Sequence, residues 1–288
     1  MANNSSLLIN NLVIDPRELY IWFVLSVFIT IIGTLACCAL LTVIIKQHNY
    51  RDGTNPLIIQ LLAVDCFTLA IPALLGYIQI YLTQIGSPSS IRCKPVFFLH
   101  YLAISVSHLI QACLAVNRCT AVQFPHYFNA VSRRSSVILM TGTIWIITLC
   151  FSVPYIFGMV ATYGQAPPLG HCTLLVNDLR VFGILGSFVT TIPFCIEGLC
   201  YAIILLVFQC QRHQIREPVT RTDVRREKKK RKENMISLVL LLCFLWYMVC
   251  YLPNTIISSY MGWYWRNHWN AFIWMRTLFG TAQAGTPV

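Results

Sequence analysis

The sequence is dominated by seven long runs of apolar residues, which lie at about 19–45, 57–82, 95–118, 137–161, 181–208, 235–260 and 269–288. Each run is near or above the ~20 residues that an α-helix needs to cross ~30 Å of hydrocarbon. Backbone amides in lipid must be hydrogen-bonded within their own segment, and the alternation typical of barrel strands is absent. The sequence therefore predicts an all-α membrane protein, a bundle of seven transmembrane helices over residues 19–288, with the last helix apparently truncated.

The positions of the basic residues predict how this bundle is oriented. Of the 21 Lys and Arg residues, 15 fall on one side of the predicted membrane: Lys46, Arg51, Arg118, Arg133, Arg134 and ten between Arg212 and Lys232. Cytoplasmic loops carry an excess of Lys and Arg, so we expect this side to be cytoplasmic. The tail 1–18 is then extracellular, and the segment 209–234 is a basic third cytoplasmic loop.

The formal net charge of +11 does not, in this arrangement, indicate a nucleic-acid partner. The basic run from Arg225 to Lys232 lies between two spans, where a solvated loop against anionic lipid or a cytoplasmic partner is favoured over a nuclear-localisation signal. The tail lacks a basic n-region and a cleavage site, so we interpret the first span as an uncleaved signal anchor. Asn3 and Asn4 begin two overlapping Asn-x-Ser sequons, which an extracellular tail would expose to glycosylation.

Two of the 13 cysteines stand apart from the rest. The other eleven lie within spans or at their inner ends, where a free thiol acts as a small apolar side chain. Cys93 and Cys172 lie on the predicted outer side, in an oxidising compartment, so we expect a disulfide between them. Two unpaired extracellular thiols are the alternative.

The sequence offers no motif for enzymatic chemistry. It contains no Walker loop, no G-x-S-x-G elbow, no H-E-x-x-H pair and no Cys/His metal-binding spacing, so we expect neither an enzyme nor a bound cofactor. Ionisable residues at membrane depth are costly and are therefore functional candidates. Asp65 lies in the second run, Glu197 in the fifth and Arg118 at the inner end of the third. Asp65 and Glu197 keep a membrane channel or transporter open as a second function.

The third and sixth runs suggest a switch between the two faces of the membrane. From Cys93 to Arg118 is 25 residues, or about 37 Å of helix, so one helix reaches both faces. Glu233, at the inner end of the sixth run, can meet Arg118 in a pair worth at most about 1 kcal/mol when exposed. Pro253 gives the sixth helix a pivot. Alternatively, Glu233 only balances the neighbouring lysines and Pro253 is a fixed kink.

The pattern of residues at these positions resembles that of the rhodopsin-like G-protein-coupled receptors, over nearly the whole chain. The third helix of that family carries an outer cysteine and an inner Asp-Arg-Tyr, where this chain has Cys93 and Asn117-Arg118-Cys119. The other matches are Leu61 to Asp65 for Leu-x-x-x-Asp, Trp145, Pro193 with Tyr201, Cys250 to Pro253 for Cys-Trp-x-Pro, and Thr286-Pro287-Val288 for the start of Asn-Pro-x-x-Tyr.

The resemblance implies roles for several residues. It implies a sodium ion between Asp65 and Ser107, a heterotrimeric G protein as partner, and a multi-pass protein of the plasma membrane. It also implies an activation switch formed by Arg118, Glu233, Tyr201, Tyr251, Pro253 and Pro287. Asn117, Cys119, Tyr251 and Thr34 depart from the family pattern.

Residues 117–125 read Asn-Arg-Cys-Thr-Ala-Val-Gln-Phe-Pro, which resembles the Asn-Arg-x-Thr-Ala-Val-x-Phe-Pro signature of nematode serpentine chemoreceptors of the gamma and V classes. This implies a sensory receptor for an extracellular small molecule. In aminergic relatives the position of His100 is an aspartate, and in opsins the position of Gly280 is a lysine, so we expect neither a monoamine nor retinal.

A ligand pocket in such a bundle is concave, mostly apolar and open to the outside. The residues expected to line it are His100, Tyr101, Ile104, Asn254, Thr255, Ser258 and Arg276, although each could instead make an interhelical contact. A histidine and an arginine at the mouth suit an acidic or polar ligand. We expect the ligand to favour one helix arrangement, in which the inner end of the sixth helix swings outward about Pro253 and opens a groove for the G protein.

Overall fold

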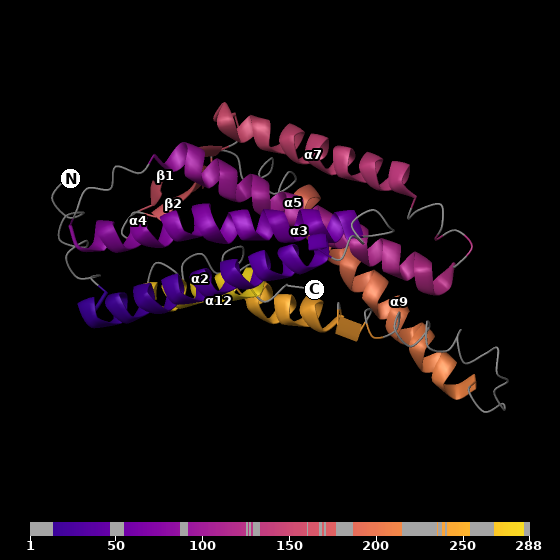
Figure 1. The fold of residues 1–288 in the computed structure, drawn as a ribbon. Helices are drawn as coiled ribbons and strands as arrows, with labels where there is room; N and C mark the ends of the chain where they lie inside the picture. The colour runs from indigo at the N-terminus through magenta and orange to yellow at the C-terminus, as the bar shows by residue number, and fades with distance from the viewer. Residues whose placement is uncertain are drawn as a thin grey trace.

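The structure is a computed structural model that describes residues 14–46, 55–86, 92–124, 133–159, 161–166, 171–176, 187–214, 241–253 and 268–284, with the isolated positions 126, 128, 169, 235, 238 and 239. Long helices run side by side along one direction (Figure 1). Asn3, Asn4, Glu233, Asn254, Thr255, Ser258 and Pro287, all predicted site residues, lie outside the described residues.

Helices occupy all seven of the predicted runs. They are α2 (Pro16–Lys46), α3 (Asn55–Thr68) continued by η2 (Leu69–Ala73) and α4 (Leu74–Gln84), α5 (Cys93–Gln123), α7 (Arg134–Ile156), η3 (Ser187–Thr191) continued by α9 (Ile192–Gln214), the helix Leu241–Pro253, and α12 (Trp269–Ala284). Within the described residues, five of these helices are long and apolar enough to cross a membrane. The predicted all-α seven-helix membrane bundle is confirmed; the side on which the N-terminus lies stays a prediction.

The bundle is apolar outside and carries polar side chains inside. Leu139 and Ile146 on α7 and Leu35 on α2 are 72%, 64% and 64% exposed, whereas Ser26, Asp65 and Asn117 are 1%, 2% and 0% exposed. Such an apolar surface would make a soluble protein aggregate. With lipid as the solvent it is the expected surface, and the polar groups must find partners within the bundle.

The second span is not a regular helix. A π-helical turn, η2, interrupts it between α3 and α4 and contains Pro72. Proline lacks the amide hydrogen that a regular helix needs at this point, and a π-turn accommodates the defect by widening the helix locally. The interruption begins four residues after Asp65, so it shapes the helix that positions the buried carboxylate.

The fourth helix ends earlier than the predicted limit of residue 161, and a β-hairpin follows it. Gly158 adopts a left-handed conformation (φ 68°), and the amide of Met159 donates to the carbonyl of Pro154 at 3.0 Å, which closes the helix end. Antiparallel strands β1 (Ala161–Ala166) and β2 (His171–Val176) then pair. At the other boundary, α9 runs to Gln214, so residues 209–214 are helical and do not belong to a loop.

A disulfide joins the hairpin to the third helix. Cys93, the first residue of α5, is bonded to Cys172 of β2, as the sequence predicted. The amide of Gln79, which is fully buried in α4, donates to Cys93 Sγ at 3.3 Å. We call this end of the bundle, where α2 begins and the hairpin lies (Figure 1), the disulfide end.

The first and last helices pack closely along their length. The indole nitrogen of Trp22 donates to the carbonyl of Ile273 and to the hydroxyl of Thr277, both at 2.8 Å. Further along the same interface, a Cβ atom on Gly33 would lie 2.6 Å from Cβ of Ala284. Only glycine allows the two backbones to approach this closely.

We therefore expect the substitution Gly33→Ala to destabilise the bundle by about 1–3 kcal/mol, because the added methyl group overpacks the contact with α12. The matched control is Gly142→Ala, since a Cβ atom on Gly142 of α7 meets nothing within 4 Å. The midpoint of thermal unfolding in detergent should fall for G33A and stay level or rise for G142A. Equal effects would contradict the assigned packing.

Candidate functional site

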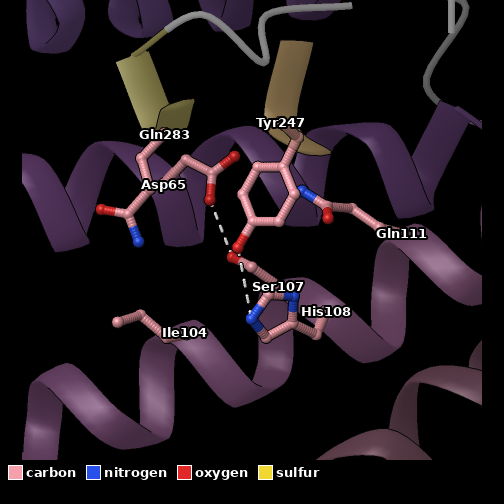
Figure 2. A pocket seen from close by; sticks show the side chains of 7 residues that line it. All are labelled: Asp65, Ile104, Ser107, His108, Gln111, Tyr247 and Gln283. Carbon is pink, nitrogen blue, oxygen red and sulfur yellow. Dashed lines mark hydrogen bonds between the residues drawn. The ribbon is translucent and has the colours of Figure 1, made fainter. Parts of the chain in front are cut away.

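Side chains from segments far apart in the sequence meet around a small cavity, as Figure 2 shows. The cavity is lined by Asp65, Ile104, Ser107, His108, Gln111, Tyr247 and Gln283. They come from α3, α5, the helix Leu241–Pro253 and α12. Segments more than 200 residues apart in sequence thus share one polar site. A side chain in this site can contact several helices and so link their positions.

Asp65 and Ser107 form the anionic side of this site. The Ser107 hydroxyl donates to Asp65 Oδ1 at 2.7 Å, and both residues are buried. The two residues that the resemblance assigned to a sodium ion are therefore in contact. Carboxylate, hydroxyl and amide oxygens are the ligands that hard cations prefer, and Gln111 and Gln283 line the same cavity, so the donor set fits a sodium ion. Elsewhere in the described residues, no three His, Cys, Asp or Glu side chains are placed to hold a metal.

His108 forms the opposite side of the site and connects α5 to the helix Leu241–Pro253. Its Nε2 atom lies 3.3 Å from the Tyr247 hydroxyl, and both side chains are buried. The imidazole also contacts the ring of Tyr251 at a centroid distance of 5.5 Å, and Tyr247 stacks on Tyr251 at 5.2 Å. Tyr251, which stands where the family has a tryptophan, thus packs against the hydrogen-bonded His108–Tyr247 pair.

Arg118 lies at the opposite end of α5 from the disulfide. One turn before it, Ala115 packs in a cluster with Tyr201 and Ile204 of α9 and with Leu241. The charge of Arg118 is close enough to act on Tyr201. Two residues of the predicted switch, Arg118 and Tyr201, are thus neighbours.

At the disulfide end, Arg276 and His100 are neighbours. The charge of Arg276 acts on both His100 and Tyr77, and a Cβ atom on Gly76 would lie only 3.5 Å from Arg276 Nη2. The guanidinium group therefore lies beside α4 at Gly76. Nδ1 of His100 is buried without a hydrogen-bond partner among the described residues.

An aromatic cluster lies beside His100. Its members come from α5, α7 and β1: Phe97, Phe98, Tyr101, Tyr155 and Tyr163. The ring of Phe97 lies 6.3 Å from that of His100 and 5.6 Å from that of Tyr163. Burial, with a smaller contribution from Tyr155, raises the pKa of Tyr163 to about 12, so its phenol stays protonated.

Of the residues predicted to line a ligand pocket, the described ones divide between two places. His100, Tyr101 and Arg276 lie at the disulfide end, whereas Ile104 lines the central cavity. Sequence reasoning missed His108, Gln111, Tyr247 and Gln283. The signal was available for α5, because Ser107, His108 and Gln111 are polar residues within an apolar span at helical spacing.

Comparison with known proteins shows which family this chain resembles. Residues 36–279 match the family described as "7 transmembrane receptor (rhodopsin family)". The chain is 26% identical over 196 residues to the D(2)-like dopamine receptor of Takifugu rubripes, covering 66% of this chain and 40% of that protein. It is 24% identical over 214 residues to the D(2) dopamine receptor A of Xenopus laevis, covering 72% and 45%. The chain thus spans less than half the length of these curated relatives.

We expect Tyr247→Phe to destabilise the bundle by about 1 kcal/mol, because His108 Nε2 loses its partner in a site that excludes bulk water. The matched control is Tyr20→Phe, since Tyr20 faces outward and is 59% exposed. Thermal unfolding in detergent should separate the two. The double variant H108L/Y247F should be less than additive, because it removes both partners together. A Y247F midpoint equal to that of Y20F would show that the pair contributes nothing.

Proposed function

From the membership of this chain in the rhodopsin family of seven-transmembrane receptors, we propose that it is a G-protein-coupled chemosensory receptor. Members of this family are multi-pass proteins of the plasma membrane that act as signalling receptors and not as enzymes. A small molecule binds at the disulfide end, and a heterotrimeric G protein binds at the Arg118 end. This assignment requires that the disulfide end faces outward, which is also the orientation that the basic residues predict.

The observation that carries this proposal is that α5 contacts the helix Leu241–Pro253 at two levels, at His108 and at Ala115. His100 lies at the disulfide end, His108 bonds Tyr247 in the middle, and Ala115 packs beside Leu241 one turn from Arg118. A ligand that repositions α5 or its neighbours therefore changes the packing of this helix at two levels. A ligand shifts the population only as far as its affinity differs between the two arrangements.

The outward swing of this helix about Pro253 is the movement we propose for activation. Pro253 is the last residue of the helix Leu241–Pro253, and proline removes a backbone hydrogen bond at a bend. The stacked rings of Tyr247 and Tyr251, and the ring of Phe194 tilted against both, lie on the side of the pivot toward the Arg118 end. They must rearrange for the inner end to move.

The relatives named above are dopamine receptors, but we do not propose dopamine as the ligand. Dopamine is an amine and is cationic at neutral pH. Aminergic relatives place an aspartate where this chain has His100, and here the neighbouring group is the cation Arg276. A cationic amine would meet repulsion where those receptors offer an ion pair, so the ligand belongs to another chemical class.

We also propose that Asp65, Ser107, Gln111 and Gln283 hold a sodium ion. The ion would balance the buried carboxylate, which costs several kcal/mol to leave uncompensated in a medium of low dielectric. Such an ion ties α3, α5 and α12 together and favours the compact arrangement of the bundle.

Replacement of Arg118 tests the receptor function. Arg118→Ala should abolish ligand-evoked nucleotide exchange on G protein while surface expression is retained, because it removes the charge beside Tyr201. Arg134→Ala is the matched control, an exposed arginine at the start of α7. Exchange that survives R118A undiminished would refute this role. Ligand-gated current in cells without G proteins would favour the alternative, a channel that uses Asp65 and Glu197.

Replacement of Asp65 tests the sodium site. NaCl should raise the thermal midpoint of the purified chain more than equimolar KCl does. The extra free energy of unfolding should be about 1.4 kcal/mol when sodium is at ten times its Kd. Asp65→Asn should remove this difference, whereas Glu197→Gln, a second buried carboxyl on α9, should keep it. Identical responses to the two salts in the unsubstituted chain would rule out the site.

A further inference from the structure

Arg276 has no carboxylate partner among the described residues. The structure describes four of the ten acidic residues, Asp15, Glu18, Asp65 and Glu197, and none of the four makes an ion pair with Arg276. Glu18 accepts from Asn270 at 2.6 Å, and Asp65 accepts from Ser107. A half-buried guanidinium group without a carboxylate beside it is costly, so an anionic group placed there would stabilise it.

The guanidinium group lies where α4 and α12 meet. A Cβ atom on Gly76 of α4 would lie 3.5 Å from Arg276 Nη2, an ordinary van der Waals distance, so the group is beside this helix. One turn further along α12, a Cβ atom on Gly280 would lie 2.5 Å from the Tyr77 hydroxyl, so Tyr77 lies against the backbone of α12. Gly280 therefore lets α12 approach α4 closely beside this charge. A guanidinium group suits a carboxylate, because its fork of N–H donors matches two oxygens.

Two polar groups at the same end have no hydrogen-bond partner among the described residues: Nδ1 of His100 and the hydroxyl of Tyr163, both buried. The ring of Phe97 contacts both side chains. Buried polar groups in native proteins are nearly always paired, so each of these groups is open to a water, an ion or a ligand.

We propose that the disulfide end binds a small carboxylic acid with an apolar or aromatic body. Arg276 is the counter-ion of the carboxylate, the imidazole of His100 donates a hydrogen bond to it, and the aromatic cluster of Phe97, Phe98, Tyr101, Tyr155 and Tyr163 packs against the body. This inference rests on the proposed function, since it names the class of ligand that such a receptor would take.

The test is direct binding to the purified chain in lipid nanodiscs, with 3-phenylpropionate as the probe. Its neutral amide and the matched amine, 3-phenylpropylamine, share the same body and differ in charge. We expect the acid to bind at least about tenfold more tightly than the amide, and the amine not to bind, because loss of one partner of a desolvated charge pair weakens binding by at least that factor. Alkanoic and phenylalkanoic acids of other lengths extend the series.

Variants then assign the counter-ion. Arg276→Gln should reduce the affinity for the acid at least about tenfold and bring the acid and amide to similar affinities. Arg276→Lys should lie between, since it keeps the charge and loses the fork. His100→Leu, which leaves Arg276 in place, should weaken the acid selectively because leucine has no N–H donor, and it covers the case in which R276Q does not fold. Arg17→Gln, an exposed arginine at the same end, should change nothing.

Three results would overturn the inference: an amide that binds as well as the acid, acid affinity unchanged in R276Q and H100L, or no binding of any acid in the series. Failure of the receptor proposal gives a different result, because the acid would then bind as predicted and evoke no nucleotide exchange. Conversely, exchange evoked by a neutral or cationic compound and untouched by R276Q would keep the receptor and exclude the carboxylate.

Discussion

Lipid offers no hydrogen bonds, so the polar groups in this bundle must find their partners within the chain or on a bound ion or ligand. This constraint explains why the helices are long and why their polar side chains point inward. It also explains why hydroxyl groups on the helices bond backward to carbonyls one turn earlier, as Thr30, Thr68 and Thr148 do at 2.7–2.8 Å. A group that cannot be satisfied in this way must meet a partner on another helix, and these partners hold the bundle together.

The interhelical contacts of this kind lie at separate levels along α5. At the disulfide end, Gln79 and the Cys93–Cys172 bridge fix its first turn. In the middle, Ser107 bonds α3 and His108 bonds the helix Leu241–Pro253. Near the last turns, Ala115 and Cys119 pack with α9. The covalent bridge anchors the helix most firmly, and the contacts beyond it are weaker and reversible. Because one continuous helix makes all of them, we expect a displacement at one level to change the contacts at the others.

Much of the fold and part of the site could be predicted from the sequence. The spans, the disulfide and the Asp65–Ser107 contact depend on local composition or on a family pattern. The seven helices follow from hydropathy alone. The β-hairpin did not, because Ala161–Ala166 and His171–Val176 are short, and strand pairing depends on a partner that hydropathy does not reveal. The fourth helix was overextended for a related reason: its apolar run continues past Gly158, where backbone conformation ends the helix. The His108–Tyr247 pair joins residues 139 apart, and no spacing rule connects them.

The account depends on the two ends of α5 facing opposite sides of a membrane, with the disulfide end outside. Epitope tags, one on the tail 1–13 and one within 215–234, measure this directly by antibody staining of cells before and after permeabilisation. The account predicts that the tail tag is stained on intact cells and that the second tag is stained only after permeabilisation. Staining of the second tag alone on intact cells would reverse the orientation, and the ligand and G-protein assignments would both be wrong.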